Sequence, residues 1–222
     1  MKCWAESYCK WKIEGRECST VCDGYVWLHV LYSQSNIPRL YQYRLQEVLF
    51  DPSDNNVFIK VNEICKNVLD WVKGGNNLFL YGDSGNGKTT LACHVANEYI
   101  RKAVPYAGMD AIVYYIRSFD FLDELKLHQT SPTLEFEGVL ETVQEVDLLI
   151  IDDLGVEASN NWVREKLLSI FDYRIGEIKS TIVTSNLDLV ELKKLHGSRI
   201  EDRLGAFTQL NLKGPSRRGE HS

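Results

Sequence analysis

The chain has 222 residues, of which 44% are hydrophobic and 25% are charged, and its formal net charge at pH 7 is −6. These values are typical of a globular protein with one α/β domain and a small additional segment. No stretch approaches the ~20 consecutive apolar residues of a membrane span. Because the N-terminus also lacks the apolar core of a signal peptide, we expect a cytoplasmic protein with no membrane partner.

The first 35 residues are rich in cysteine and aromatic residues. Four of the six cysteines fall here: Cys3, Cys9, Cys18 and Cys22. A segment this short cannot build a stable apolar core, and a bound metal ion would stabilise it instead. The cysteines therefore predict a Zn²⁺ site with four thiolate ligands, and an iron–sulfur cluster or reduced thiols without a ligand are the alternatives. We expect residues 1–35 to form a small partner-binding module, and residues 36–56 to form a linker.

Patterns of helical and strand type alternate from residue 57 onward. A helix is predicted over residues 57–73, where apolar residues keep one face, and Gly74 and Gly75 end it. Strands are predicted at 78–81, 111–116, 147–151, 180–184 and 207–212, and further helices at 88–102, 118–127, 134–145, 160–176, 188–195 and 198–204. The alternation predicts an α/β domain over residues 57–222, with a mainly parallel five-stranded sheet flanked by helices.

The segment between the first strand and the next helix has the pattern G-x-x-x-x-G-K-[ST]. Its residues are Gly82, Asp83, Ser84, Gly85, Asn86, Gly87, Lys88 and Thr89, and Thr90 follows. The glycines leave the backbone free to curl, so that its N–H groups can point at a phosphate. Lys88 can reach the β- and γ-phosphates, and the Thr89 hydroxyl can bind Mg²⁺. The pattern therefore predicts a nucleoside triphosphate site.

Two carboxylates, Asp152 and Asp153, follow the apolar run Leu148–Ile151. An apolar run without alternation is typical of a central strand buried on both faces, and ligands bind at the carboxyl ends of such strands. This is the form of a Walker B motif. We expect Asp152 to hold Mg²⁺ and Asp153 to polarise the attacking water. An acidic turn after a core strand is the alternative.

Polar and basic residues further along the chain extend this predicted site. Asn186 follows the strand at 180–184, where its amide can orient the water, although Asn186 or Asp188 could instead cap the next helix. Arg199 and Arg203 lie four residues apart on one helical face. Arg203 is the preferred candidate for an arginine presented to the γ-phosphate in a neighbouring subunit, and a solvent-facing helix is the alternative. Arg218 is a candidate for a second nucleotide-sensing arginine, or part of a disordered basic tail.

These motifs together resemble the AAA+ ATPases of the DnaC/DnaI bacterial helicase-loader group, to which the IstB transposition ATPases are close. The resemblance covers residues 37–218 and rests on six segments: Ile37–Arg39, the phosphate loop, Asp147–Gly155, Trp162–Arg164, Thr184–Asn186 and Arg199–Arg203. It implies an AAA+ core with no separate lid after the last strand. It also implies ATP-dependent assembly of subunits around single-stranded DNA, with slow hydrolysis that depends on assembly, and contact with a DnaB-type replicative helicase.

The same resemblance places a DNA-tracking helical element within residues 104–140. Aromatic side chains that stack on bases, beside basic groups that pair with phosphates, are typical of single-strand binding. The candidates here are Arg117, Phe119 and Lys126, whereas Tyr114 and Phe121 are equally consistent with core positions.

Two other functions remain open at this point. One is an IstB-like ATPase that coats duplex DNA and recruits a transposase. The other is a nucleotide-gated module that binds the host's own loader. Charge alone neither establishes nor excludes DNA binding. Residues 193–222 hold 7 Lys/Arg and 3 Asp/Glu, and such a basic end on an acidic body is compatible with local phosphate contact and with a solvated tail.

Overall fold

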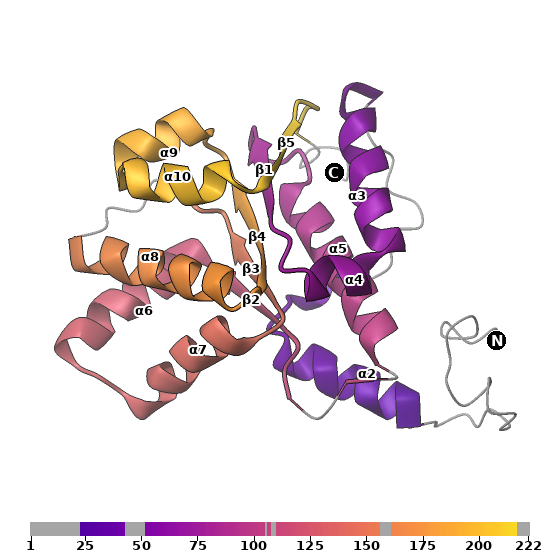
Figure 1. Cartoon of the computed structure of the whole chain (residues 1–222), viewed down its shortest axis with the longest axis horizontal. Helices are drawn as coiled ribbons and strands as arrows, with labels where there is room; N and C mark the ends of the chain where they lie inside the picture. Colours follow the sequence, from indigo (N-terminus) through magenta and orange to yellow (C-terminus); the bar gives the residue numbers. More distant parts are fainter. Residues whose placement is uncertain (1–22, 43–51, 105, 108–109, 156–160, 217–222) are drawn as a thin grey trace, which may run out of the picture.

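A five-stranded sheet forms the centre of the structure, a computed structural model that describes residues 23–42, 52–104, 106–107, 110–155 and 161–216 (Figure 1). The strands are β1 (Leu78–Gly82), β2 (Val113–Arg117), β3 (Leu148–Asp152), β4 (Ser180–Ser185) and β5 (Thr208–Leu212). They lie in the order β2–β3–β4–β1–β5, and each neighbouring pair is parallel. The predicted α/β class and parallel five-stranded sheet are therefore confirmed.

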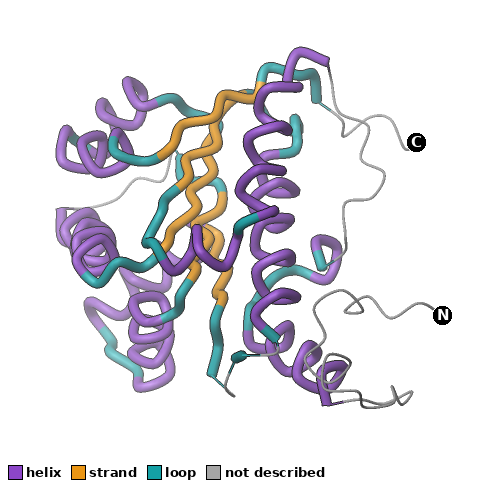
Figure 2. The backbone as a smooth tube through the Cα atoms, turned by 45° about the vertical axis from the view of Figure 1, so that its right-hand side comes forward, coloured by secondary structure: helices purple, strands orange, loops and turns teal. Residues whose placement is uncertain are grey.

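Helices cover both faces of this sheet (Figure 2). One face carries α2 (Asp23–Gln34), α3 (Asn55–Lys66), α4 (Val68–Lys73) and α5 (Lys88–Ala103). The other carries α6 (Ser118–Thr130), α7 (Leu134–Glu145), α8 (Asn161–Gly176), α9 (Leu189–His196) and α10 (Ser198–Gly205). Short 3-10 turns lie at Arg39–Tyr41 and Pro52–Asp54. Within the described ranges, no helix has the length and apolar character that a membrane crossing requires.

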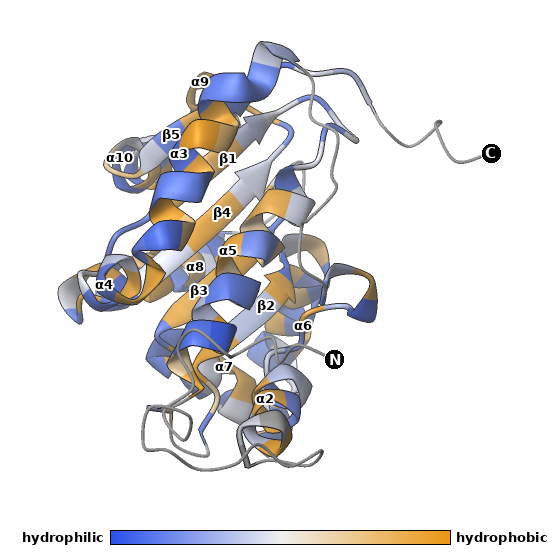
Figure 3. Ribbon diagram, turned by 90° about the vertical axis from the view of Figure 1, so that its right-hand side faces the viewer, coloured by the Kyte–Doolittle hydropathy of each residue, from blue (hydrophilic) through white to orange (hydrophobic). Residues whose placement is uncertain are grey.

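Each face of the sheet packs into its own hydrophobic core, because successive residues of a strand point to opposite faces. Leu148 and Ile150 belong to the core beneath α3, α4 and α5, whereas Leu149 and Ile151 belong to the core beneath α6, α7 and α8. All of β3 is buried, as predicted for a central strand. Figure 3 shows this strand in hydrophobic colours beside the mixed colours of α3 and α5. The sheet therefore holds the carboxyl end of β3 at a fixed place between two layers of helices.

The predicted helix over residues 57–73 is in fact two helices, α3 and α4. The break is at Asn67, whose φ of −117° and ψ of 31° are not helical. Asparagine favours such sites because its side chain competes for backbone hydrogen bonds. The break changes the direction of the chain while Ile64 and Val68, on either side of it, both remain buried.

The described part of the predicted N-terminal module packs on the body of the domain. Leu31 of α2 and Ile37 after it belong to the core cluster beneath α5. The connector, which we define as Ser35 and Asn36, bonds to strand β2: the Tyr115 N–H donates to the Ser35 carbonyl, and the Asn36 side chain donates to the Tyr115 carbonyl, each at 2.8 Å. Residues 23–37 are thus part of the packed domain, and Cys3, Cys9, Cys18 and Cys22 lie outside the described residues.

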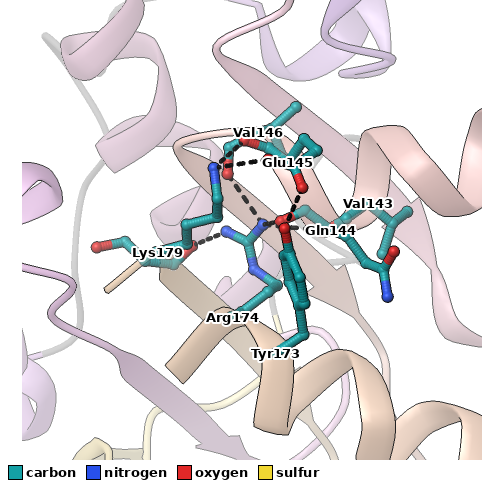
Figure 4. A network of polar contacts seen from close by, with 8 residues as sticks. Val143, Gln144, Glu145, Val146, Tyr173, Arg174 and Lys179 are labelled. Carbon is teal, nitrogen blue, oxygen red and sulfur yellow. Dashed lines mark hydrogen bonds and ion pairs between the residues drawn. The ribbon is translucent and has the colours of Figure 1, made fainter. Parts of the chain in front are cut away.

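A buried arginine ties α7, α8 and β4 together at the opposite edge of the sheet from the carboxyl strand ends (Figure 4). Arg174 is fully buried, and burial lowers the pKa of its guanidinium. Its nitrogens donate to the carbonyls of Val143, Gln144, Val146 and Ser180 and to the Thr181 hydroxyl. Because the last carbonyls of a helix lack partners within that helix, one guanidinium here satisfies the end of α7 and fixes it against β4.

We expect Arg174→Met to lower the free energy of unfolding by about 3–5 kcal/mol, because it leaves several buried carbonyls without a donor. Arg174→Lys should recover only part of this loss, since an ammonium cannot reach the same set of acceptors. Urea unfolding followed by circular dichroism measures the change. Lys166→Met, at an exposed position of the same helix, is the matched control and should change the value by about 0.5 kcal/mol or less. An Arg174→Met variant as stable as the control would contradict this role.

Candidate functional site

The predicted phosphate loop connects the end of β1 to the start of α5. Three of its glycines have positive φ: Gly82 at 134°, Gly85 at 84° and Gly87 at 102°. A Cβ on Gly82 would lie 2.1 Å from the Leu212 carbonyl oxygen, so a side chain is excluded where the loop passes β5. The loop therefore has the backbone curvature that the pattern predicts, and its end opens a helix of 16 residues. A helix N-terminus of this kind favours phosphate.

Lys88 lies inside this loop. Its side chain is buried, and its Nζ donates to the carbonyls of Gly82 and Asp83, each at 2.6 Å, and to the Asn86 Oδ1 at 3.1 Å. The Asn86 amide in turn donates to the Leu212 carbonyl at 2.9 Å, which anchors the loop to β5. The structure thus places a buried positive charge at the centre of the loop, where it can pair with a phosphate group.

Asp152 is the hub of the polar contacts at the carboxyl edge of the sheet. Its Oδ1 accepts from the hydroxyls of Thr89 at 2.8 Å and Thr184 at 2.7 Å, and its Oδ2 accepts from the Tyr115 hydroxyl at 2.7 Å. The carboxylate and the Thr89 hydroxyl are hard oxygen donors of the kind that Mg²⁺ prefers. Burial and the nearby Asp152 raise the pKa of the Tyr115 phenol, which therefore stays protonated and donates.

Asp153 and Asn186 form a second pair beside this hub. The Asn186 amide donates to the Asp153 Oδ1 at 2.8 Å, and the Asp153 N–H donates to the Thr184 hydroxyl at 2.8 Å. Asp153 has a φ of 59°, which is uncommon for a residue other than glycine. The N-terminus of α9 is capped by Asp188, whose carboxylate accepts from the Glu191 N–H. Asn186 is therefore not the cap of α9, and its amide instead donates to Asp153, the carboxylate that we expect to polarise water.

The two arginines of α10 both contact α8. Arg199 donates to both carboxylate oxygens of Glu165 at 3.1 Å, and Arg203 donates to Asp172. These ion pairs are exposed, with 57% and 36% of the two arginine side chains accessible. Solvent screens exposed pairs, which therefore contribute little to stability, so either arginine can exchange its partner at small cost.

The predicted DNA contacts lie on β2 and α6. Arg117 is exposed at the end of β2, and Phe119 is 60% exposed, whereas Lys126 pairs with Asp123 at 2.7 Å. Phe121 is buried in the core, in agreement with the alternative given for it. The groove of about 870 Å³ beside α6 is lined in part by four acids: Asp120, Asp123, Glu124 and Glu135. These carboxylates would repel a phosphate backbone, although Arg117 also lines this groove.

Asp54 holds the chain that follows β5 against the phosphate loop. This buried carboxylate accepts from the N–H groups of Lys213 at 2.7 Å and Gly214 at 3.0 Å. A Cβ on Gly85 would lie 2.2 Å from the Ser216 Oγ, so this chain crosses the loop closely. Arg218 lies outside the described residues. Ser216, the last described residue, lies beside the loop.

The described cysteines, Cys65 and Cys93, are both buried thiols. Burial raises the pKa of Cys65 to about 12, and burial together with the charge of Asp152 raises that of Cys93. Both are therefore packed thiols, not reactive ones. Among the residues whose placement is described, no group of His, Cys, Asp and Glu side chains is arranged to hold a metal ion through three or more of its members. The zinc prediction rests entirely on cysteines outside this part of the chain.

Sequence reasoning did not find the roles of Thr184, Tyr115 and Asp54. Thr184 had a usable signal, since a hydroxyl in a buried strand two residues before Asn186 needs a hydrogen-bond partner. Tyr115 and Asp54 had none, because their partners lie 37 and 159 residues away along the chain.

Comparison with known proteins agrees with this geometry. Residues 46–204 match the family described as IstB-like ATP binding protein. The replicative helicase loader DnaI of Bacillus subtilis (strain 168) is 34% identical over 144 residues, which cover 64% of this chain and 43% of that protein. The ATP-binding protein named for an insertion sequence of Pseudomonas fluorescens is 35% identical over 118 residues, which cover 53% of this chain and 47% of that protein. The chain thus spans less than half the length of each of these curated relatives.

A solved structure extends the similarity to three dimensions. The crystal structure of the DnaC helicase loader aligns with a TM-score of 0.66 at 25% identity, over 79% of this chain and 100% of that one. The resemblance inferred from the motifs is therefore confirmed.

Proposed function

Because the chain belongs to the IstB-like ATP-binding protein family, we propose that it binds ATP with Mg²⁺ and hydrolyses the ATP slowly, in an assembly of several copies. The observation that carries this proposal is that the polar residues of the predicted site lie together at the carboxyl edge of the sheet. Thr89 bonds to Asp152 and Asn186 bonds to Asp153, while Lys88 lies in the phosphate loop. Lys88 and the loop N–H groups would hold the phosphates, while Thr89 and Asp152 would hold Mg²⁺. A bound Mg²⁺ would neutralise charge that develops on the phosphoryl oxygens.

The biological role that we propose is the loading of a DnaB-type replicative helicase onto single-stranded DNA, with ATP promoting the assembly of copies. Support comes from the 34% identity to the loader DnaI and from the structural similarity to the loader DnaC. The exposed Arg117 and Phe119, at the carboxyl edge of β2, are the proposed DNA contacts together with Lys126, which would have to leave its ion pair with Asp123. We also propose that a phage or mobile element encodes the chain, which the 35% identity to an insertion-sequence protein supports.

An IstB-like role in DNA transposition is the second candidate. The insertion-sequence protein from Pseudomonas fluorescens favours it, since that protein is 35% identical to this chain. The two roles differ in the nucleic acid that the assembly would hold, because a loader acts on single strands whereas an IstB-like regulator coats duplex DNA.

We expect the chain to form an ATP-dependent complex with a DnaB-type helicase and to prefer single-stranded over duplex DNA in ATP. Size-exclusion chromatography with light scattering gives the mass of the complex, and fluorescence anisotropy gives the two DNA affinities. Lys88→Ala is the control that removes nucleotide binding. A strong duplex preference would favour the transposition role. Absence of any helicase complex, with or without ATP, would exclude the loader role.

Hydrolysis would use Asp153 within one subunit and an arginine from the next. Asn186 holds Asp153 in place, which suits a carboxylate that polarises water. Arg203 is the preferred arginine, with Arg199 second. Arg199 is exposed and Arg203 partly exposed on α10, where an approaching neighbour could replace the carboxylates of α8 as their partners. Arg218 is proposed to approach the same phosphates from within its own subunit.

Variants of these residues should separate binding from turnover. Lys88→Ala should abolish nucleotide binding, and Asp153→Ala should leave binding intact while slowing turnover about 100-fold. Arg203→Ala should slow turnover of the assembly by about 10³-fold without affecting binding by single subunits. Fluorescent-nucleotide titration and phosphate release measure the two properties.

Mixing Asp153→Ala with Arg203→Ala subunits tests whether the arginine acts across the interface. Some sites in the mixture would combine an intact Asp153 with an intact Arg203, so part of the activity should return. No recovery at any mixing ratio would exclude this role for Arg203. Tight ATP binding by Lys88→Ala would contradict the assignment of the loop.

The N-terminal cysteines are proposed to bind one Zn²⁺ ion in a segment that contacts the helicase. The support is their number and closeness in the sequence: Cys3, Cys9, Cys18 and Cys22. Elemental analysis of the purified protein should find about one zinc per chain, as four thiolates fill one tetrahedral site. The variant Cys18→Ser should lose the metal, whereas Cys65→Ala, at a buried thiol, should retain it. Zinc-free wild-type protein with four alkylatable N-terminal thiols would exclude the site.

A further inference from the structure

Tyr115 links the predicted metal site to the start of the described chain. Its side chain is buried and points to the same face of the sheet as Asp152, whose Oδ2 accepts from the Tyr115 hydroxyl at 2.7 Å. The other oxygen of the carboxylate is already held by Thr89 and Thr184. Since a carboxylate held at one oxygen can still rotate, the bond at Oδ2 fixes its plane.

The backbone of the same residue is held by the connector. The Tyr115 N–H donates to the Ser35 carbonyl, and the Tyr115 carbonyl accepts from the Asn36 amide, both at 2.8 Å. Strand β2 is an edge strand, so on its outer side these groups would otherwise face no neighbouring strand. Ser35 is fully buried, and Asn36 has a φ of 54° that turns the chain at this point. The connector thus holds β2 at Tyr115, the residue whose hydroxyl donates to Asp152.

We propose that Tyr115 is a positioning residue for Asp152, and that the connector sets the place of Tyr115 and so adjusts the affinity for Mg²⁺. This inference rests on the proposed ATP–Mg²⁺ site. A displacement of the connector, which follows directly from α2, would move β2 at Tyr115 and loosen the bond to Oδ2. The metal site and the N-terminal part of the chain would then be energetically coupled, and by linkage each would respond to the other.

Tyr115→Phe tests the first link, because it removes one hydroxyl and keeps the ring and the backbone bonds. In a titration with a fluorescent ADP analogue, affinity without Mg²⁺ should match the wild type. Mg²⁺ should increase the affinity for the analogue. The Mg²⁺ concentration that gives half of this increase should rise about tenfold in the variant, the size expected for losing one hydrogen bond to a charged group. Mn²⁺ binding followed by electron paramagnetic resonance should weaken by a similar factor. Tyr114→Phe, the same change at the neighbouring residue on the opposite face of β2, should leave both values unchanged.

Asn36→Gly tests the second link. Glycine accepts the positive φ of this position, so the substitution removes the side-chain bond to Tyr115 without straining the turn. We expect Asn36→Gly to weaken Mg²⁺ binding by a smaller factor, about threefold. A double variant of Asn36→Gly and Tyr115→Phe should bind Mg²⁺ as well as Tyr115→Phe alone, because the two substitutions act through one bond.

Three results would overturn the inference: wild-type Mg²⁺ dependence in Tyr115→Phe, wild-type dependence in Asn36→Gly, or fully multiplicative effects in the double variant. If Tyr115→Phe does not fold, as judged by circular dichroism, Asn36→Gly alone decides. Wild-type protein whose nucleotide binding ignores Mg²⁺ would instead remove the proposed function, and this inference with it.

Discussion

The geometry of the site depends on the need of one buried carboxylate for partners. Asp152 is only 5% exposed, and a buried charge without hydrogen bonds would be strongly unfavourable. Its partners come from three different elements: Thr89 from α5, Thr184 from β4 and Tyr115 from β2. These bonds form only when the three neighbouring strands β2, β3 and β4 are in register and α5 is packed against them. The same contacts that satisfy the carboxylate therefore also fix the relative positions of the elements that would hold a nucleotide.

The positions of the strands and of the phosphate loop could be predicted because their signals are local. The loop pattern lies within eight consecutive residues, and the apolar run of β3 needs no distant partner to be recognised. The Tyr115–Asp152 bond could not be predicted, because it depends on the register that sets Arg117 opposite Asp152 on neighbouring strands. The ion pairs of Arg199 and Arg203 with α8 depend in the same way on how two helices pack. The break at Asn67 was missed because apolar periodicity continues across it.

Polar groups have different roles at the two edges of the sheet. At the carboxyl edge, Asp152 and Asp153 are each joined to hydroxyl or amide donors that leave them next to the phosphate loop. At the other edge, the Arg174 side chain is fully buried, and backbone carbonyls surround its guanidinium. The first arrangement suits exchange with a ligand, and the second suits permanent bracing. Burial and partner type, more than charge alone, distinguish them.

The packing of the connector against β2 has a practical consequence for isolating this domain. A truncation at residue 36, the boundary suggested by composition, would remove Leu31 from the core and the Ser35 carbonyl from the strand edge. Unpaired strand edges invite pairing with other chains, which leads to aggregation. A shortened protein should therefore keep all of α2, beginning at or before Asp23.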